Sequence, residues 1–306
     1  MVDLGSFYQG IGVVVVLILL GFFLSKIKVL NDVAVKAITN LLLSVALPIA
    51  FMRSFPASFS VDAGRMFVWG IGAAALLFAI LIPLAQVFFR GKSDNYEYKF
   101  AFLFNNTSFI GYPLVSAAFG LEGMTVYAGF MLVWTLVVFT YGVKLFNRKF
   151  GFRDVIKSLV NPNVIGIVAG ATMFLCSFQM PAFGNKLFGT IAGVTTPLSL
   201  LCVGFMLSEA RLVTIFKRWR VVIVCILQLI VPPVLTYFVL KLIGAPLVVI
   251  QVAVLMEALP TAALLGLFTK KYRGGKHLAS EAGEIVALST ILSLVTVPIL
   301  VNLLVI

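Results

Sequence analysis

Long apolar runs follow one another along nearly all of this sequence, and each is long enough to cross a lipid bilayer. A membrane-spanning helix needs about 20 predominantly apolar residues. Only short connections separate the runs, which leaves no room between them for a water-soluble domain. The sequence predicts an all-α integral membrane protein with ten transmembrane helices, at residues 6–24, 35–55, 65–89, 100–119, 124–145, 162–180, 187–208, 219–243, 247–269 and 282–305.

The composition excludes a soluble protein of the same length. Of the 306 residues, 61% are hydrophobic and 11% are charged, and the mean hydropathy is +1.13. Soluble globular chains carry about 25% charged residues and about 45–50% apolar ones. A water-soluble fold could not bury this excess of apolar surface, so the solvent for most of the chain must be lipid.

Few residues are suited to catalysis. The one histidine, His277, lies in a charged string, which excludes a metal site built on two imidazoles and a buried Ser-His pair. Cys176, Cys202 and Cys225 each lie alone in an apolar run and are interpreted as small core residues. We therefore expect no enzyme, no cofactor and no metal apart from Na⁺.

The basic residues are distributed unevenly between the connections. Nineteen of the 23 lysines and arginines lie in alternate connections, and the opposite side has only Arg53, Arg65, Lys186 and Lys241. The positive-inside rule then predicts that both termini lie on the non-cytoplasmic side of the plasma or inner membrane. Topology and anionic lipid headgroups also account for the net charge of +12, so no nucleic-acid partner is expected. The nineteen are Lys26, Lys28, Lys36, Arg90, Lys92, Lys99, Lys144, Arg148, Lys149, Arg153, Lys157, Arg211, Lys217, Arg218, Arg220, Lys270, Lys271, Arg273 and Lys276.

Prolines near mid-span indicate an internal repeat. Spans two, four, seven and nine each contain one, at Pro48, Pro113, Pro197 and Pro260. The interval within each pair is 65 or 63 residues, and the interval between corresponding prolines is 149 or 147. Because five spans is an odd number, the second half must enter the membrane from the opposite side. The sequence thus predicts a 5+5 inverted repeat, with halves at residues 1–160 and 161–306, which is typical of secondary transporters. The alternative is that prolines are simply common in membrane helices.

Spans four and nine are predicted to be discontinuous helices that cross near the middle of the bilayer. A proline removes a backbone donor, and in lipid the freed carbonyl groups must face protein or a water-filled cavity. Each second half-helix is expected to begin near its proline, so that two positively polarised N-termini meet and attract an anion such as a carboxylate. The alternative is that the polar residues only join helices together. The candidate substrate-binding residues are Asn105, Asn106, Thr107, Ser108, Gly111, Tyr112, Pro113, Pro260 and Thr261.

Glu257 is the acid that lies well inside a span, three residues before Pro260. A carboxylate at that depth costs about 2.5–3.5 kcal/mol on insertion scales and usually has a functional partner. Glu257 could bind a coupling Na⁺ with freed carbonyl groups, or take up a proton. Asn106 and Thr135 complete the candidate cation set. The alternative is a buried acid with a structural role only.

Four motifs resemble the auxin efflux carrier family, whose bacterial members include malate and malonate permeases. They are LPIAF in span two, NNTSFIGYPL in span four, TTPLSLLCVGFML in span seven and ALPTAALLGLFTKKY in span nine. The resemblance covers essentially all ten spans. It implies a fold related to that of the bile acid:sodium symporters. Spans 3–5 and 8–10 would form a mobile transport unit, and spans 1, 2, 6 and 7 a scaffold that is often dimeric.

The same resemblance implies a function. It suggests elevator-type transport of an organic anion, with Asn106 and the crossing at Pro113 and Pro260 holding the substrate carboxylate. Glu257 is similar in placement to a sodium-ligating acid of the bile acid symporters. Two other functions stay open at this point, a monovalent cation/proton antiporter on the same scaffold and a membrane sensor that does not transport.

Overall fold

The computed structural model describes residues 4–90, 95–147, 150–151, 153, 155–156, 160–209, 218–273 and 276–304. Within these ranges the chain is helical, and its one extended pairing is an isolated bridge between Asn105 and Thr261. The helices are α1 (Leu4–Lys26), α2 (Asp32–Leu41), η1 (Leu42–Ala46), α3 (Leu47–Met52), α4 (Val61–Phe88), α5 (Tyr96–Leu103), η2 (Thr107–Gly111), α6 (Tyr112–Val137), η3 (Val138–Gly142), α7 (Val143–Phe146), α9 (Pro162–Leu175), α10 (Ala182–Gly193), α11 (Thr195–Glu209), α13 (Trp219–Leu242), α14 (Leu247–Ala258), α15 (Leu264–Phe268), η4 (Thr269–Arg273) and α16 (Lys276–Leu304), where η marks a π-helical turn.

Seven helical segments in the described part of the chain are long and apolar enough to cross a membrane. They are Tyr8–Lys26, Asp32–Met52, Val61–Phe88, Thr107–Phe146, Ala182–Glu209, Trp219–Leu242 and Glu281–Leu304. Two shorter apolar helices are α9 and α14. The prediction of an all-α membrane protein is confirmed. The count of ten spans stays a prediction, because several of the expected spans consist of short or interrupted helices.

The longest of these segments is folded back on itself. Gly120 interrupts α6 with φ 55° and ψ −146°. In a straight helix Tyr112 and Tyr127 would lie about 22 Å apart, but their ring centroids are 6.1 Å apart. Gly120 therefore separates the expected spans 100–119 and 124–145, and a glycine tolerates this positive φ without the strain of a Cβ atom.

Two prolines follow π-helical turns at the same offset. The turn η1 ends two residues before Pro48, and η2 ends two residues before Pro113. A widened turn accommodates the proline ring, which has no N–H and clashes with the preceding turn of a regular helix. By contrast, Pro83 lies inside the continuous helix α4.

Three helix pairs are in backbone contact through glycine residues, and we call these contacts the glycine seams. A Cβ atom added at Gly204 of α11 would lie 2.0 Å from the carbonyl oxygen of Ile18 in α1. Small residues allow membrane helices to approach this closely. The seams join α1 with α11 through Gly21 and Gly204, α4 with α6 through Gly70 and Gly129, and α3 with α9 through Gly166 and Gly170.

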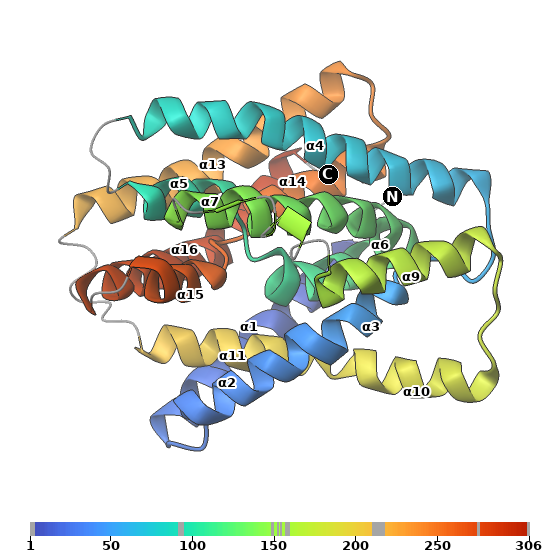
Figure 1. Cartoon of the computed structure of the whole chain (residues 1–306), viewed down its shortest axis with the longest axis horizontal. Helices are drawn as coiled ribbons and strands as arrows, with labels where there is room; N and C mark the ends of the chain where they lie inside the picture. The colour runs from blue at the N-terminus through green and yellow to red at the C-terminus, as the bar shows by residue number, and fades with distance from the viewer. Residues whose placement is uncertain are drawn as a thin grey trace.

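These contacts organise the bundle in Figure 1. The helices α2, α10 and α11 lie along one side of the molecule, and α4 and α13 lie along the opposite side. Between the two sides lie α5, α6 and α14. The α3–α4 and α9–α10 connections lie together at one end of the bundle, at the right of the view.

Two details concern the sequence predictions. Cys202 and Cys225 are buried as expected, but Cys176 is exposed where α9 ends, so its interpretation as a core residue was wrong. The hydrophobic run there continues past the end of the helix. Six of the basic residues used for topology lie outside the described residues, namely Lys92, Arg148, Lys149, Lys157, Arg211 and Lys217.

Candidate functional site

The centre of the molecule contains two interrupted helices whose breaks pair with each other. One break, residues 104–106, separates α5 from η2, and the other, residues 259–263, separates α14 from α15. The Asn106 N–H donates to the Pro260 carbonyl at 2.6 Å, and the Ala262 N–H donates to the Phe104 carbonyl at 2.8 Å. This antiparallel pairing satisfies backbone groups that lipid could not satisfy. We call the paired breaks the crossing.

The position of the first break corrects the sequence prediction. The break was expected at Gly111–Pro113, but it lies before residue 107, and Pro113 sits in the first turn of α6. The reason is a helix cap: the Asn106 side chain accepts a hydrogen bond from the Phe109 N–H at 3.3 Å, so the second half-helix already begins at Thr107. Pro260 lies inside the second break, four residues before α15 begins.

Gly111 brings the two interrupted segments into contact. A Cβ atom added there would lie 2.9 Å from Leu259 Cδ1 and 3.2 Å from Met256 Sδ. Because both neighbours belong to the second interrupted segment, Gly111 allows η2 to pack directly against the end of α14.

Asn105 is the polar hub of the crossing. Its amide nitrogen donates to Glu257 Oε2 at 2.8 Å and to the Glu257 carbonyl at 3.1 Å. Its amide oxygen accepts a hydrogen bond from Gln228 Nε2 at 2.7 Å, and the same Gln228 nitrogen also donates to the Leu259 carbonyl at 2.6 Å. All three side chains are at most 2% exposed. The buried carboxylate is thus held by an amide network, and its direct partner is Asn105 rather than Asn106.

A small cavity of about 40 Å³ lies beside the crossing. Four of the predicted substrate residues line it, namely Asn105, Asn106, Thr107 and Ser108. The other described lining residues come from α2, η1, η2, α6, α11 and the second interrupted segment, and none of them is a lysine or arginine: Thr39, Leu43, Phe109, Trp134, Met206, Ala262, Ala263, Leu264 and Leu267. The cavity is large enough for water and would have to widen for a small carboxylate.

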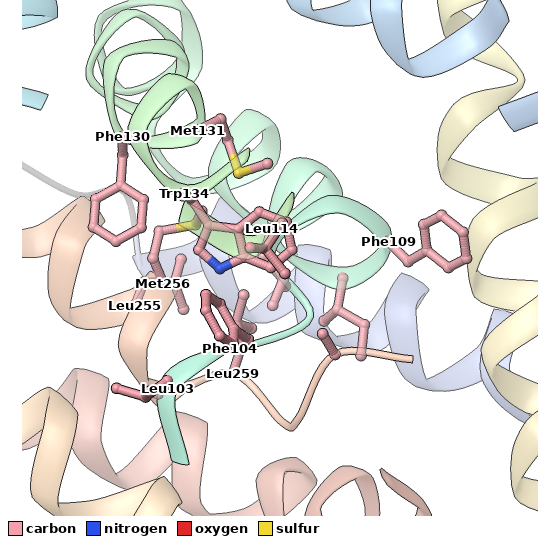
Figure 2. Close-up of a cluster of buried hydrophobic side chains, with 14 of the residues drawn as sticks. Leu103, Phe104, Phe109, Leu114, Phe130, Met131, Trp134, Leu255, Met256 and Leu259 are labelled. Carbon is pink, nitrogen blue, oxygen red and sulfur yellow. The ribbon is translucent and has the colours of Figure 1, made fainter. Parts of the chain in front are cut away.

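Two buried donors that line this cavity lack partners. The Thr107 hydroxyl and the Trp134 indole nitrogen make no hydrogen bond within the described part of the chain. An unpartnered buried polar group costs about 1–3 kcal/mol, and an indole N–H can only donate. Figure 2 shows Trp134 beside Phe104, in a cluster of apolar side chains that includes Met256 and Leu259. Both residues line the cavity, so an acceptor placed there would be the partner that the fold does not supply.

The remaining predicted residues surround the cavity without lining it. Tyr112 packs on Tyr127, whose hydroxyl donates to the Thr107 carbonyl at 2.9 Å. The Thr261 N–H donates to the hydroxyl of Ser289 at 3.1 Å.

Thr135, a predicted cation-binding residue, follows Trp134 in α6. Its hydroxyl is buried and has no partner among the described residues, and no hydrogen bond joins it to Glu257 there. Pro113 is buried in the first turn of α6.

Sequence reasoning missed Gln228, Trp134 and Ser289. A glutamine within an apolar span was a usable signal, because an amide in lipid requires a partner. Trp134 gave no such signal, since aromatic residues are frequent in membrane helices and its unpartnered nitrogen is a property of the fold. Ser289 is one of several hydroxyl residues in α16, and its contact with Thr261 depends on tertiary structure.

Chemically, the crossing offers neutral hydrogen-bond donors and one buried acid. The half-helix beginning at Thr107 contributes the partial positive charge of its N-terminus, and α15 begins beside it. Amide, indole and hydroxyl groups add donors. Such a site suits a small anion, or an anion together with a cation held at the acid.

The long apolar helices define a class, the polytopic membrane proteins. Comparison with known proteins identifies the family. A family model described as "Membrane transport protein" matches residues 7–155 and 148–301, so the chain belongs to this family, the auxin efflux carrier family that its motifs resemble. The chain is 25% identical over 297 residues to an "Uncharacterized transporter" of Methanothermobacter thermautotrophicus, with 94% of each chain covered. The family is a class of transporters, not of enzymes.

Proposed function

We propose that this protein is a secondary active transporter of a small organic anion, a carboxylate of the size of malate or malonate, and that the anion binds at the crossing. The observation that carries the proposal is the pair of unpartnered buried donors, the Thr107 hydroxyl and the Trp134 indole, on one cavity beside a capped helix N-terminus. A carboxylate oxygen supplies the acceptor that both donors lack. The absence of cations from the described lining favours an anion that enters with a positive ion.

The architecture that we propose is the 5+5 inverted repeat of ten spans, with halves at residues 1–160 and 161–306. Two glycine seams support a scaffold, since α1 contacts α11 and α3 contacts α9 through them. The third seam joins α4 to α6, and α13 packs on α14 and α16, which supports a separate transport unit. In an elevator mechanism the transport unit carries the crossing past the scaffold. The cavity is suited to this motion, because α2, η1 and α11 line one part of it, and α6 and the two interrupted segments line the rest.

Glu257 is proposed as the coupling group for Na⁺ or H⁺. It is 2% exposed, and its described side-chain hydrogen bond comes from a neutral amide. A cation at this carboxylate would neutralise the charge of the bound anion during the passage through lipid.

We further propose that both termini lie on the non-cytoplasmic side of the plasma or inner membrane, in accordance with the positive-inside rule. The scaffold helices are proposed to form a homodimer.

Uptake into proteoliposomes tests the proposal. Purified protein reconstituted with an imposed Na⁺ or H⁺ gradient should accumulate radiolabelled malate, malonate or a related acid saturably, and unlabelled acid should compete. Empty liposomes provide the background. If no acid in such a panel enters above background under either gradient, the proposed function is wrong.

A monovalent cation/proton antiporter is the second candidate, because the buried Glu257 could exchange H⁺ for Na⁺ without an anion. A pH-sensitive dye inside the proteoliposomes separates the two functions. Na⁺-driven proton movement without any organic anion would favour the antiporter, whereas a dye response that requires the acid would favour the anion transporter. Binding of an acid without flux in either assay would instead indicate a sensor.

A further inference from the structure

A second cavity, far larger than the one at the crossing, opens at one end of the bundle. It has a volume of about 500 Å³, within the range of small-molecule sites. The α3–α4 and α9–α10 connections, the adjoining parts of α3, α9 and α10, and Leu121 beside the Gly120 fold of α6 form its walls. We call it the end cavity. Under the topology proposed above it faces the outside of the cell.

Arg53 is the charged residue of the end cavity among the described residues that line it. Its Nη1 donates to the Asn185 carbonyl at 3.0 Å and to the Asn185 side-chain oxygen at 2.6 Å. No ion pair of Arg53 occurs within the described ranges, in contrast to Arg218, which pairs with Glu284 at 3.2 Å, and Arg65, which pairs with Asp62 at 3.8 Å. A guanidinium carries five N–H donors in a planar fork, so Arg53 retains donors for a carboxylate.

Neighbouring residues connect the end cavity to the crossing. Phe51, two residues before Arg53, packs on the Tyr127 ring with the ring centroids 5.8 Å apart. The Tyr112 ring packs on Tyr127, and the Tyr127 hydroxyl donates to the Thr107 carbonyl at the crossing. An anion held by Arg53 would thus lie at the end of a series of residues that leads to the proposed transport site.

We propose that the end cavity is a second, weaker carboxylate-binding site, in which Arg53 captures the anion before it reaches the crossing. The inference rests on the proposed function for its substrate class, but not for its location. One free guanidinium in an open cavity gives a modest, salt-sensitive affinity.

Equilibrium binding of radiolabelled malonate to the full-length protein tests this site. Asn106→Ala disables the crossing and should leave weak binding that falls as ionic strength rises. Adding Arg53→Gln to Asn106→Ala should lower the remaining affinity at least about tenfold, the loss of one charge-assisted hydrogen bond. Equal malonate binding by the two proteins, including no binding by either, would overturn the proposal.

Three further variants separate charge from structure. Arg65→Gln, at the same end of the bundle, should not change malonate binding. Asn185→Ala and Arg53→Lys keep the positive charge and should keep affinity within about threefold, with thermal unfolding confirming the fold. If Asn185→Ala and Arg53→Lys both lose affinity as completely as Arg53→Gln, Arg53 has only a structural role and the proposed site does not exist. Arg53-dependent binding without carboxylate uptake by the wild-type protein would keep this site and remove the transport proposal.

Discussion

The crossing and the glycine seams depart from an ordinary membrane helix in opposite ways. At the crossing, two helices lose internal hydrogen bonds, and an extended pair between Asn105 and Thr261 replaces part of them. At the seams the helices stay intact, and glycine residues without side chains allow the backbones at Gly204 and Ile18 to come into contact. The paired breaks at the crossing thus leave free hydrogen-bond donors and a cavity, whereas the glycine seams leave no space between the helices.

This difference indicates where the protein is specialised and where it is rigid. Buried amide and hydroxyl groups are concentrated at the crossing, where Asn105, Gln228 and Glu257 form one network. The seams are formed by backbone and apolar contacts at their glycines, which hold helix pairs at fixed distances, and the α1–α11 pair adds a hydrogen bond from Ser208 to Ser25. Substitutions at the crossing should therefore change transport more than stability, and substitutions at the seams should do the reverse.

The largest effect is expected from Asn106→Ala. The substitution removes the cap of η2 and a polar group of the cavity, so uptake of acid below saturation should fall about 100-fold, equivalent to about 2.7 kcal/mol. Loss of the cap alone should lower stability by only about 1 kcal/mol. Asn31→Ala is the matched control, because Asn31 caps α2 away from the crossing. Equal uptake by the two variants would remove Asn106 from the site.

Glu257→Gln should abolish coupling. A potential of 100 mV is worth about 2.3 kcal/mol per charge and can drive about 50-fold accumulation. The variant keeps an acceptor for Asn105 but cannot bind or release the coupling charge, so imposed Na⁺ and H⁺ gradients should no longer increase uptake. Glu209→Gln, at the exposed end of α11, is the control. An undiminished response of Glu257→Gln to both gradients would end the coupling proposal.

Trp134→Phe removes one indole N–H and keeps an aromatic ring. If this N–H donates to the substrate, the concentration of acid that half-saturates uptake should rise about tenfold, which corresponds to one hydrogen bond to a charged acceptor. The unfolding temperature should fall only by what the smaller buried ring costs in packing, because the lost N–H itself has no protein partner within the described residues. Trp219→Phe, an exposed tryptophan of α13, is the control. An unchanged half-saturation value would show that the indole faces no substrate.

Gly70→Ala tests the seams. The new Cβ atom would lie 2.1 Å from the Val126 carbonyl oxygen, so α4 and α6 must move apart. Overpacking of this kind costs about 1–3 kcal/mol, and the unfolding temperature in detergent should fall by about 5 °C. Gly72→Ala, in the same helix and without a neighbour within 4 Å, should not lower it. Similar unfolding temperatures for both variants would mean that the seam does not constrain the bundle.

Helix type, membrane class and family could be predicted from the sequence, because they depend on local apolar runs and on short motifs. The proline of span four indicated an interrupted helix, but not its place, since Asn106 caps the second half-helix before Pro113 is reached. The pairing of Asn105 with Thr261 could not be predicted, because it joins residues from the two halves of the chain. The same holds for Gln228, whose role depends on how α13 packs against α14.

The central claim is that the paired breaks hold the transported anion. The most direct test is an experimental density map of the full-length protein with the carboxylate that gives the highest uptake. The account predicts density for the acid between Asn106, Thr107 and Trp134, with the cavity widened around it and residues 104–106 and 259–263 still non-helical. Density for the acid away from these residues, or continuous helices through both segments, would contradict it.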